Sequence, residues 1–235
     1  MNQMSSKELS IGKRLYLAHA DSLSVFYKNN LNDQYNEHLR TIVNTLLKTE
    51  SAGGIKGTIY FISCGKTLTV CNKISAMLNS LDISSRSLNA NECLHGDIGT
   101  INVNRYEDIV FGVSISGNTR EVINCLNLLM GKINMSKNLM SKITIAMITG
   151  TRECEMNQLV NNWNFSNTLQ IVLDYSDIIK DSELYKGIKA PTLSLQLLYL
   201  YMDCLFLDVV DEISNDGDMG DKFLMNHPSG GLGKR

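Results

Sequence analysis

The feature that most constrains the fold is a series of short apolar runs, rich in β-branched residues, separated by segments with helical spacing. The clear runs and one more polar run occupy residues 58–64, 108–115, 142–149, 169–175 and, for the polar one, 83–89. Apolar character without alternation is typical of strands buried on both faces of a parallel sheet. Helical spacing appears between runs in residues 67–81, 119–131 and 151–162. The alternation predicts an α/β fold, a doubly wound five-stranded parallel sheet flanked by helices.

The N-terminal part of the sequence has a different pattern. Residues 11–30 and 36–50 each gather apolar side chains on one helical face, and a Ser-Ala-Gly-Gly run then ends the second helix. We therefore expect an N-terminal helical segment, residues 1–55, that packs on a core domain formed by residues 56–235.

The longest helical pattern spans residues 190–213, and Pro191 suits its first turn. Its apolar residues cover nearly every side, which indicates a deeply buried helix or a subunit interface. No stretch approaches the roughly 18 uninterrupted apolar residues of a membrane span, and the N-terminus lacks the apolar core of a signal peptide. We expect a cytoplasmic protein that does not enter a membrane.

Charge and cysteine content exclude several function classes. The 22 basic and 24 acidic residues give a net charge of −2, so no general attraction to nucleic acid or to an anionic membrane is expected. The six cysteines form no C-x-x-C pair, which favours free thiols in a reducing compartment over a structural zinc site. We expect neither a metal nor a cofactor.

The junction "SISGNT", residues 114–119, lies between an apolar run and a helical segment. Ser114, Ser116 and Thr119 supply hydroxyl groups, and Gly117 permits a tight turn that directs backbone N–H groups outward. With the positive end of the following helix, these groups suit a single phosphate. The alternative is helix capping, in which Asn118 and a glutamate three residues later form a capping box.

A second junction, "FISCGKTLTV", follows the first apolar run. Ser63, Gly65, Lys66 and Thr67 combine a hydroxyl, a flexible backbone, a cation and a helix-capping residue. A nucleotide P-loop is excluded because the motif needs glycine where Tyr60 stands. The alternative to a ligand site is an ordinary strand–helix turn with a surface lysine.

Three further segments carry polar side chains that could do chemistry. "NECLHGDIG" contains His95, "DSELYKGIKAPT" contains Glu183, and "NHPSGGLGKR" contains His227. Taken alone, the first segment reads equally well as a polar loop, a lone glutamate such as that of the second is usually solvated surface, and the third is typical of a frayed tail.

Taken together, the segments resemble the sugar isomerase (SIS) domains, and among them the arabinose 5-phosphate isomerases. "CGKT", "NECLHGDIG", "SISGNTREV", "SELYKGIKAPT" and "HPSGGLGKR" are similar, in order, to the motifs of that family, and cover about residues 55–235. The resemblance implies a flavodoxin-like SIS fold, a homotetramer, and a sugar phosphate as the ligand.

The resemblance also implies roles for residues at matching positions. The family's catalytic positions fall on Lys66, Glu121, Glu183, His227 and His95. Its phosphate-binding positions fall on Ser114, Ser116 and Thr119 with Gly117, and Ser63, Gly65 and Thr67 are possible contributors from the first turn. In an aldose–ketose isomerisation through an enediol, Glu183 would be the general base, a histidine would shuttle protons, Lys66 would stabilise the enediolate, and Glu121 would orient or share acid–base duty. More than one chain would be needed to complete the site.

The sequence departs from the family at several places. Its E-x-C-P segment reads E-L-Y-K here, and its S-N-S reads S-I-S, with Ile115 replacing an amide. Paired CBS modules, which common members carry, do not follow Arg235, so we expect a lone SIS domain or part of a longer protein. Two alternatives stay open: a sugar-phosphate sensor without catalysis, or another SIS enzyme such as a hexulose-phosphate isomerase.

Overall fold

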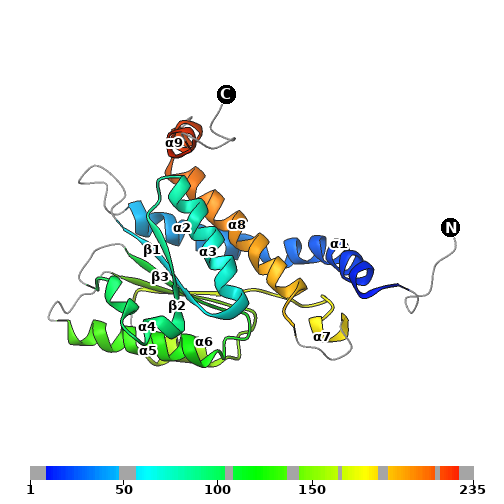
Figure 1. Cartoon of the computed structure of the whole chain (residues 1–235), viewed down its shortest axis with the longest axis horizontal. Helices are drawn as coiled ribbons and strands as arrows, with labels where there is room; N and C mark the ends of the chain where they lie inside the picture. The colour runs from blue at the N-terminus through cyan, green and yellow to red at the C-terminus, as the bar shows by residue number, and fades with distance from the viewer. Residues whose placement is uncertain are drawn as a thin grey trace.

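The computed structural model describes residues 9–47, 57–103, 108–136, 143–163, 166–184, 190–214 and 218–227. Five parallel strands form one sheet in the order β2-β1-β3-β4-β5 (Figure 1). Their bounds are β1 Ile59–Ser63, β2 Ser85–Asn89, β3 Ile109–Ser114, β4 Thr144–Thr149 and β5 Thr168–Val172. This is the strand order of flavodoxin-like folds, and the predicted five-stranded parallel sheet is confirmed.

Burial explains why the strands read as they do in the sequence. Every residue of the central strands β1, β3 and β4 is buried, so these runs are continuously apolar. The edge strand β2 exposes Arg86 and half-buries Ser87 and Asn89, which accounts for its more polar sequence.

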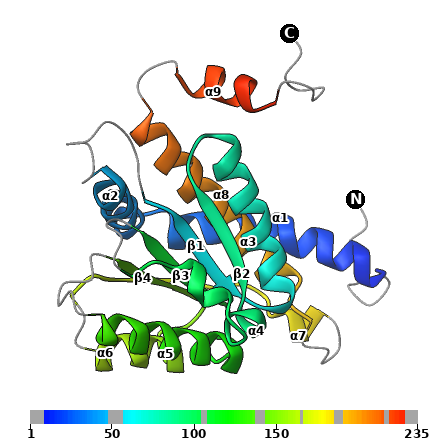
Figure 2. The same cartoon turned by 60° about the vertical axis from the view of Figure 1, so that its left-hand side comes forward.

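Helices cover both faces of the sheet and bury two separate hydrophobic cores (Figure 2). One face is covered by α1 Ile11–Asn30, α2 Asp33–Leu47, α3 Gly65–Ser80 and α8 Leu193–Ile213. The other is covered by α4 Ala90–Cys93, α5 Arg120–Met135 and α6 Glu155–Asn162. A 3₁₀ turn, Asp97–Thr100, follows α4, and the short helices α7 Asp181–Leu184 and α9 Asp218–Asn226 pack on the first core through Leu184 and Phe223.

The helix α8 packs the first layer of helices onto the sheet. Its Phe206 ring makes edge contacts with Phe61 of β1 and Phe111 of β3, at centroid distances of 5.1 and 5.4 Å. Within the described residues it is the one helix long and apolar enough to cross a membrane, yet half of that apolar stretch is buried inside the protein. Leu200 and Leu207 lie on its exposed side. The side of α8 that faces the sheet is therefore buried as in a core helix.

Several element ends differ from the predicted ones. Residue 65 begins α3, with Cys64 as its N-cap, so Thr67 lies inside the first turn and does not cap it. Pro191 precedes the N-cap of α8 and is not in its first turn. Short helices α4, α7 and α9 were not expected, because four to nine residues hold too little periodicity to be recognised.

The predicted N-terminal segment contains α1 and α2, as expected. Phe26 and Ile42 from these helices join the same core as Leu197 and Phe206 of α8. The predicted boundary at residues 55 and 56, and the helix-ending run before it, lie outside the described residues.

Candidate functional site

The strand order creates a crevice at the carboxyl ends of β1 and β3. The chain leaves β1 toward α3 on one face and leaves β3 toward α5 on the other, so the two connections diverge (Figure 2). Ligands of open α/β sheets bind at such a switch point. The structure places Ser63 and Ser114 here: the hydroxyl of Ser63 donates a hydrogen bond to the carbonyl of Val113, 2.9 Å away.

The loop that follows β3 gathers its hydroxyl groups around one side chain. The Oγ of Ser114 lies 2.7 Å from the Oγ1 of Thr119 and 3.4 Å from the Oγ of Ser116. It also accepts a hydrogen bond from the backbone N–H of Gly117 at 3.1 Å. The predicted hydroxyl cluster is thus present as a connected network at the start of α5.

Gly117 is required by its surroundings. Its φ is +62°, a value that side chains disfavour, and an added Cβ would lie 2.3 Å from the Sγ of Cys154. The Gly117 carbonyl accepts a hydrogen bond from the N–H of Met156 at 3.0 Å. The loop is therefore packed tightly against the start of α6.

The capping interpretation of the loop is wrong. The N-cap of α5 is Thr119, and its side chain makes no capping hydrogen bond. The side-chain oxygen of Asn118 instead accepts a hydrogen bond from the N–H of Glu155, at 2.9 Å, and so determines where α6 begins. The first turn of α5 is left with uncapped N–H groups and the positive end of the helix dipole, which together suit an anion.

The turn after β1 supplies the other wall of the crevice. Gly65 has a φ of +59°, Lys66 is exposed, and the N-cap Cys64 makes no side-chain capping hydrogen bond to α3. Burial and, after it, the negative charge of Glu121 raise the pKa of the Cys64 thiol. That electrostatic contact places Glu121, at the start of α5, near the turn that carries Lys66.

His95 follows β2, the neighbour of β1, so it lies at the same edge of the sheet. Its side chain is exposed, and its backbone N–H donates to the carbonyl of Glu92 at 2.9 Å. The adjoining 3₁₀ turn is held by the amine of Lys132, which donates to the carbonyls of Ile98 and Ile101 at 3.1 and 2.5 Å. Burial lowers the pKa of this amine.

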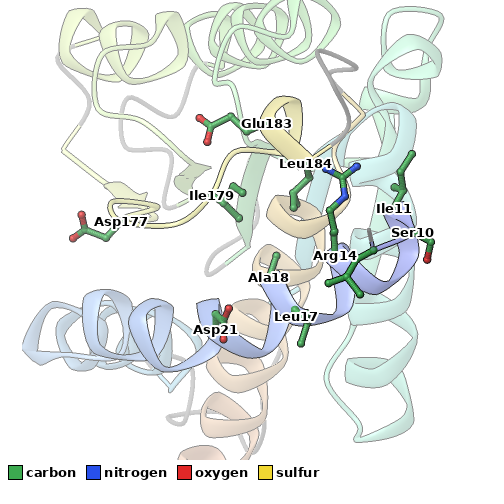
Figure 3. A pocket seen from close by; sticks show the side chains of 11 residues that line it. Ser10, Ile11, Arg14, Leu17, Ala18, Asp21, Asp177, Ile179, Glu183 and Leu184 are labelled. Atoms are coloured by element: carbon green, nitrogen blue, oxygen red, sulfur yellow. The ribbon is translucent and has the colours of Figure 1, made fainter. Parts of the chain in front are cut away.

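Glu183 lies on α7, at a pocket of about 990 Å³ between this helix and α1. Arg14 reaches from α1 toward α7, Leu184 points back toward α1, and Glu183 extends from α7 at the rim (Figure 3). The Nε of Arg14 is buried and has no hydrogen-bond partner in the described part of the chain. No residue of the 114–119 loop is among the residues that line this pocket.

His227 is the one predicted residue that the structure places far from the crevice. It follows α9, where its ring stacks on Phe223 at a centroid distance of 4.0 Å. Asn226 anchors this helix by donating to the carbonyl of Ser80 and the carboxylate of Asp82, at the end of α3 opposite to Lys66. Since α3 has 16 residues, about 24 Å of helix separates its two ends.

Sequence reasoning missed two residues that shape this region, Lys132 and Asp181, and gave a third, Asn118, the wrong helix to cap. Asn118 caps α6, Lys132 pins the turn near His95, and Asp181 caps α8 from α7. Each acts on a segment distant along the chain, so no local pattern could have revealed it. Within the described residues, no three His, Cys, Asp or Glu side chains gather as metal ligands would.

Comparisons with known proteins bear on this geometry. No protein-family model matches the sequence. The arabinose 5-phosphate isomerase of Pseudomonas aeruginosa is 28% identical over 180 residues, which is 77% of this chain. The alignment spans 47% of that relative, so this chain corresponds to about half of its length.

Solved structures align over nearly the whole chain. A protein from Escherichia coli CFT073 in complex with arabinose 5-phosphate aligns with a TM-score of 0.65, covering 97% of this chain and 100% of that one, at 17% identity. The sugar isomerase domain of an RpiR transcription factor from Sphaerobacter thermophilus aligns with a TM-score of 0.55 over 92% and 96% of the two chains, at 11% identity.

The chain has the sugar isomerase (SIS) fold. Within this SIS fold the predicted residues lie in three places. The largest group lies at or after the carboxyl ends of β1, β2 and β3: Ser63, Gly65, Lys66, Thr67, His95, Ser114, Ser116, Gly117, Thr119 and Glu121. Glu183 lies on a separate helix, and His227 lies at the opposite end of α3.

Proposed function

We propose that this protein is an aldose–ketose isomerase of sugar phosphates that interconverts D-arabinose 5-phosphate and D-ribulose 5-phosphate in the cytoplasm. The observation that carries the proposal is the hydroxyl-lined loop at the switch point, where Ser114 holds Thr119 and Gly117 in place before an uncapped helix. The 28% identity to an arabinose 5-phosphate isomerase supports the choice of substrate.

The loop is proposed to anchor the phosphate group. The Ser116 and Thr119 hydroxyls and the first N–H groups of α5 would bind its oxygens, and Lys66 from the opposite turn would add a positive charge. A phosphate fixed at one end holds the sugar carbons in one place, so that the proton-transfer groups act on a positioned carbon.

The proton transfer is proposed to use the carboxylates and histidines. Glu183 would remove the proton from C2 of the aldose and return it to C1, and His95 or His227 would move protons at the two oxygens. Lys66 would stabilise the enediolate, and Glu121, close to the same turn, would orient it.

We further propose that two chains of a homotetramer complete each site. His227 lies across α3 from Lys66, so this histidine would serve the site of a neighbouring chain. Exposed Leu200 and Leu207 on α8, with Tyr16 and Tyr27 on α1, offer apolar surface for such an assembly.

Proton exchange measured by NMR tests the proposal. In D₂O, the wild type should transfer deuterium to C1 of ribulose 5-phosphate and to C2 of arabinose 5-phosphate. Glu183→Gln should slow this exchange by about 10²- to 10⁴-fold, the usual contribution of a general base. Glu212→Gln, an exposed glutamate at the end of α8, is the matched control and should leave the rate unchanged. Absence of exchange with every pentose and hexose phosphate tested would refute the isomerase.

A second candidate function is a sugar-phosphate sensor. It is favoured by the wide separation of His227 from the crevice and by the sugar isomerase domain found in an RpiR transcription factor. Binding of a sugar phosphate in calorimetry, without deuterium exchange in the same sample, would decide for the sensor. Exchange with a hexulose phosphate alone would decide for another isomerase of this fold.

A further inference from the structure

The carboxylate of Asp181 caps the first turn of α8 from outside that helix. Its Oδ1 accepts hydrogen bonds from the backbone N–H groups of Thr192 and Leu193, at 3.1 and 2.8 Å. Its Oδ2 accepts from the backbone N–H of Ser194 at 3.3 Å and from the hydroxyl of the same residue. The α8 N-cap, Thr192, provides no side-chain cap of its own. One side chain of α7 thus binds three consecutive N–H groups of α8.

A second residue of α7, Leu184, is also held by packing, whereas Glu183 is not. Leu184 is 4% exposed and belongs to the core beneath α8. Upstream, the Tyr175 hydroxyl donates to the carbonyl of Ser194 at 3.1 Å, which ties the segment after β5 to the same turn of α8. Glu183 lies between these anchors and is exposed at the rim of the pocket (Figure 3).

The partner of Asp181 is itself rigid. The helix α8 is held on the sheet by the contacts of Phe206 with Phe61 and Phe111. A carboxylate at a helix N-terminus is also stabilised by the helix dipole, which strengthens this link. The position of α7 is therefore determined by α8, through a residue two positions from Glu183.

We propose that Asp181 is a positioning residue, which holds the Glu183 carboxylate in the place its base function requires. This inference rests on the proposed function of Glu183. A four-residue helix has too few internal hydrogen bonds to hold its own position, so the anchor to α8 decides where Glu183 lies. Small displacements of a catalytic group reduce the rate strongly.

Steady-state kinetics and thermal unfolding of three single variants test the inference. Asp181→Ala should lower kcat by about 10- to 100-fold with little change in KM, since phosphate binding occurs elsewhere. Asp181→Asn should recover part of kcat, because its amide oxygen still accepts from Thr192 and Leu193. Asn32→Ala removes a comparable cap from α2, where Asn32 accepts from the N–H of Gln34 at 3.0 Å. This control should lower Tm without lowering kcat.

A double-variant cycle separates positioning from general destabilisation. If Asp181 acts through Glu183, then Asp181→Ala should cause no further loss of kcat in the Glu183→Gln background. Equal losses in both backgrounds, or a wild-type kcat for Asp181→Ala beside a lowered Tm, would overturn the inference. If Asp181→Ala does not fold, the same cycle is run with Asp181→Asn.

The outcomes also distinguish this inference from the proposed function. If the wild type shows no deuterium exchange, the isomerase function and the positioning role of Asp181 are both refuted. If the wild type and Glu183→Gln are both active, Glu183 is not the general base, and Asp181 then has no base to position. If the wild type is active, Glu183→Gln is inactive and Asp181→Ala is fully active, only the positioning role of Asp181 is refuted.

Discussion

Ser114 determines the shape of the switch-point loop at the scale of single residues. Its hydroxyl contacts the hydroxyls of Thr119 and Ser116 and the N–H of Gly117, although the side chain itself is buried. A buried hydroxyl with several partners costs more to remove than an exposed one, because its partners lose their hydrogen bonds.

Ser114→Ala should therefore weaken phosphate binding. We expect the Kd for inorganic phosphate and the KM for the sugar phosphate to rise by about 3- to 10-fold, the equivalent of one neutral hydrogen bond. Calorimetry with phosphate and steady-state kinetics measure the two quantities. Ser24→Ala, on the exposed side of α1, is the control, and equal effects of the two replacements would contradict the assignment.

Gly117→Ala should destabilise the protein and disrupt the loop. The positive φ alone costs about 1–2 kcal/mol for an L side chain, and the added Cβ also collides with Cys154. Gly131→Ala, within α5, is the matched control: nothing lies within 4 Å of its added Cβ, so helix propensity should make it neutral or stabilising by up to about 1 kcal/mol. Urea unfolding of both variants measures the difference, and similar free energies of unfolding would refute the explanation.

At the scale of elements, the contacts that α8 makes with the sheet and with α2 hold the helices of this face in place. Phe206 attaches α8 to β1 and β3, and Tyr35 of α2 donates its hydroxyl hydrogen to Asp208 of α8. The Nδ1 of His38 of α2 lies 3.4 Å from the hydroxyl of Tyr201 of α8. The N-terminal pair of helices is thereby attached to the core through α8.

Phe206→Ala should cost about 3–5 kcal/mol of unfolding free energy, because it leaves a cavity between α8 and the sheet. Leu207→Ala changes the next residue of the same helix, which is 43% exposed and makes no such cavity. Denaturant titration of both variants should show a large loss for the first and a small one for the second. Comparable losses would show that α8 is not anchored at Phe206.

The pH dependence of stability should report the burial of His38. Burial lowers the pKa of His38 below its ordinary value of 6.5, against opposing contributions from Glu37 and the backbone of Gln170. Its folded-state pKa is thus below the unfolded one, so the stability it contributes is complete above pH 6.5 and is lost as the pH falls from there through the folded pKa.

His38→Gln should make the free energy of unfolding less dependent on pH on the acid side of neutrality. Urea titrations across that range measure this slope. His19→Gln replaces a histidine on α1 and controls for the general effect of removing one. A slope that His38→Gln leaves unchanged would contradict the prediction.

At the scale of the whole molecule, local composition was enough to predict the layers. Central strands are buried on both sides, so their sequences carry a continuous apolar signal, and the helices between them carry a periodic one. The polar strand β2 was harder to recognise because Arg86 faces solvent at the sheet edge. Where α6 starts could not be predicted, because the cap comes from Asn118, 37 residues away.

The candidate site shows the same difference between features set by local sequence and features set by long-range contacts. Residues of the two turns, such as Lys66 and Ser114, could be predicted to lie at the same edge of the sheet, since parallel strands bring their carboxyl ends to one edge. The placement of Glu183 depends on the contact of Asp181 with α8, and that of His227 on the contact of α9 with the far end of α3. Such long-range contacts between polar groups leave no periodic pattern in the sequence.

The strand order also affects how the chain folds while it is being synthesised. Contacts between β1 and β2 join residues 26 apart, as between Ser85 and Ile59, whereas contacts between β1 and β3 close a loop of 50 residues, as between Thr58 and Asp108. During synthesis β1, α3 and β2 leave the ribosome before β3 exists. Until β3 is made, β1 is a largely apolar strand with one unpaired edge, which is the kind of surface that associates with other chains. The seam that forms the crevice is therefore also the place where newly made protein is most exposed to aggregation.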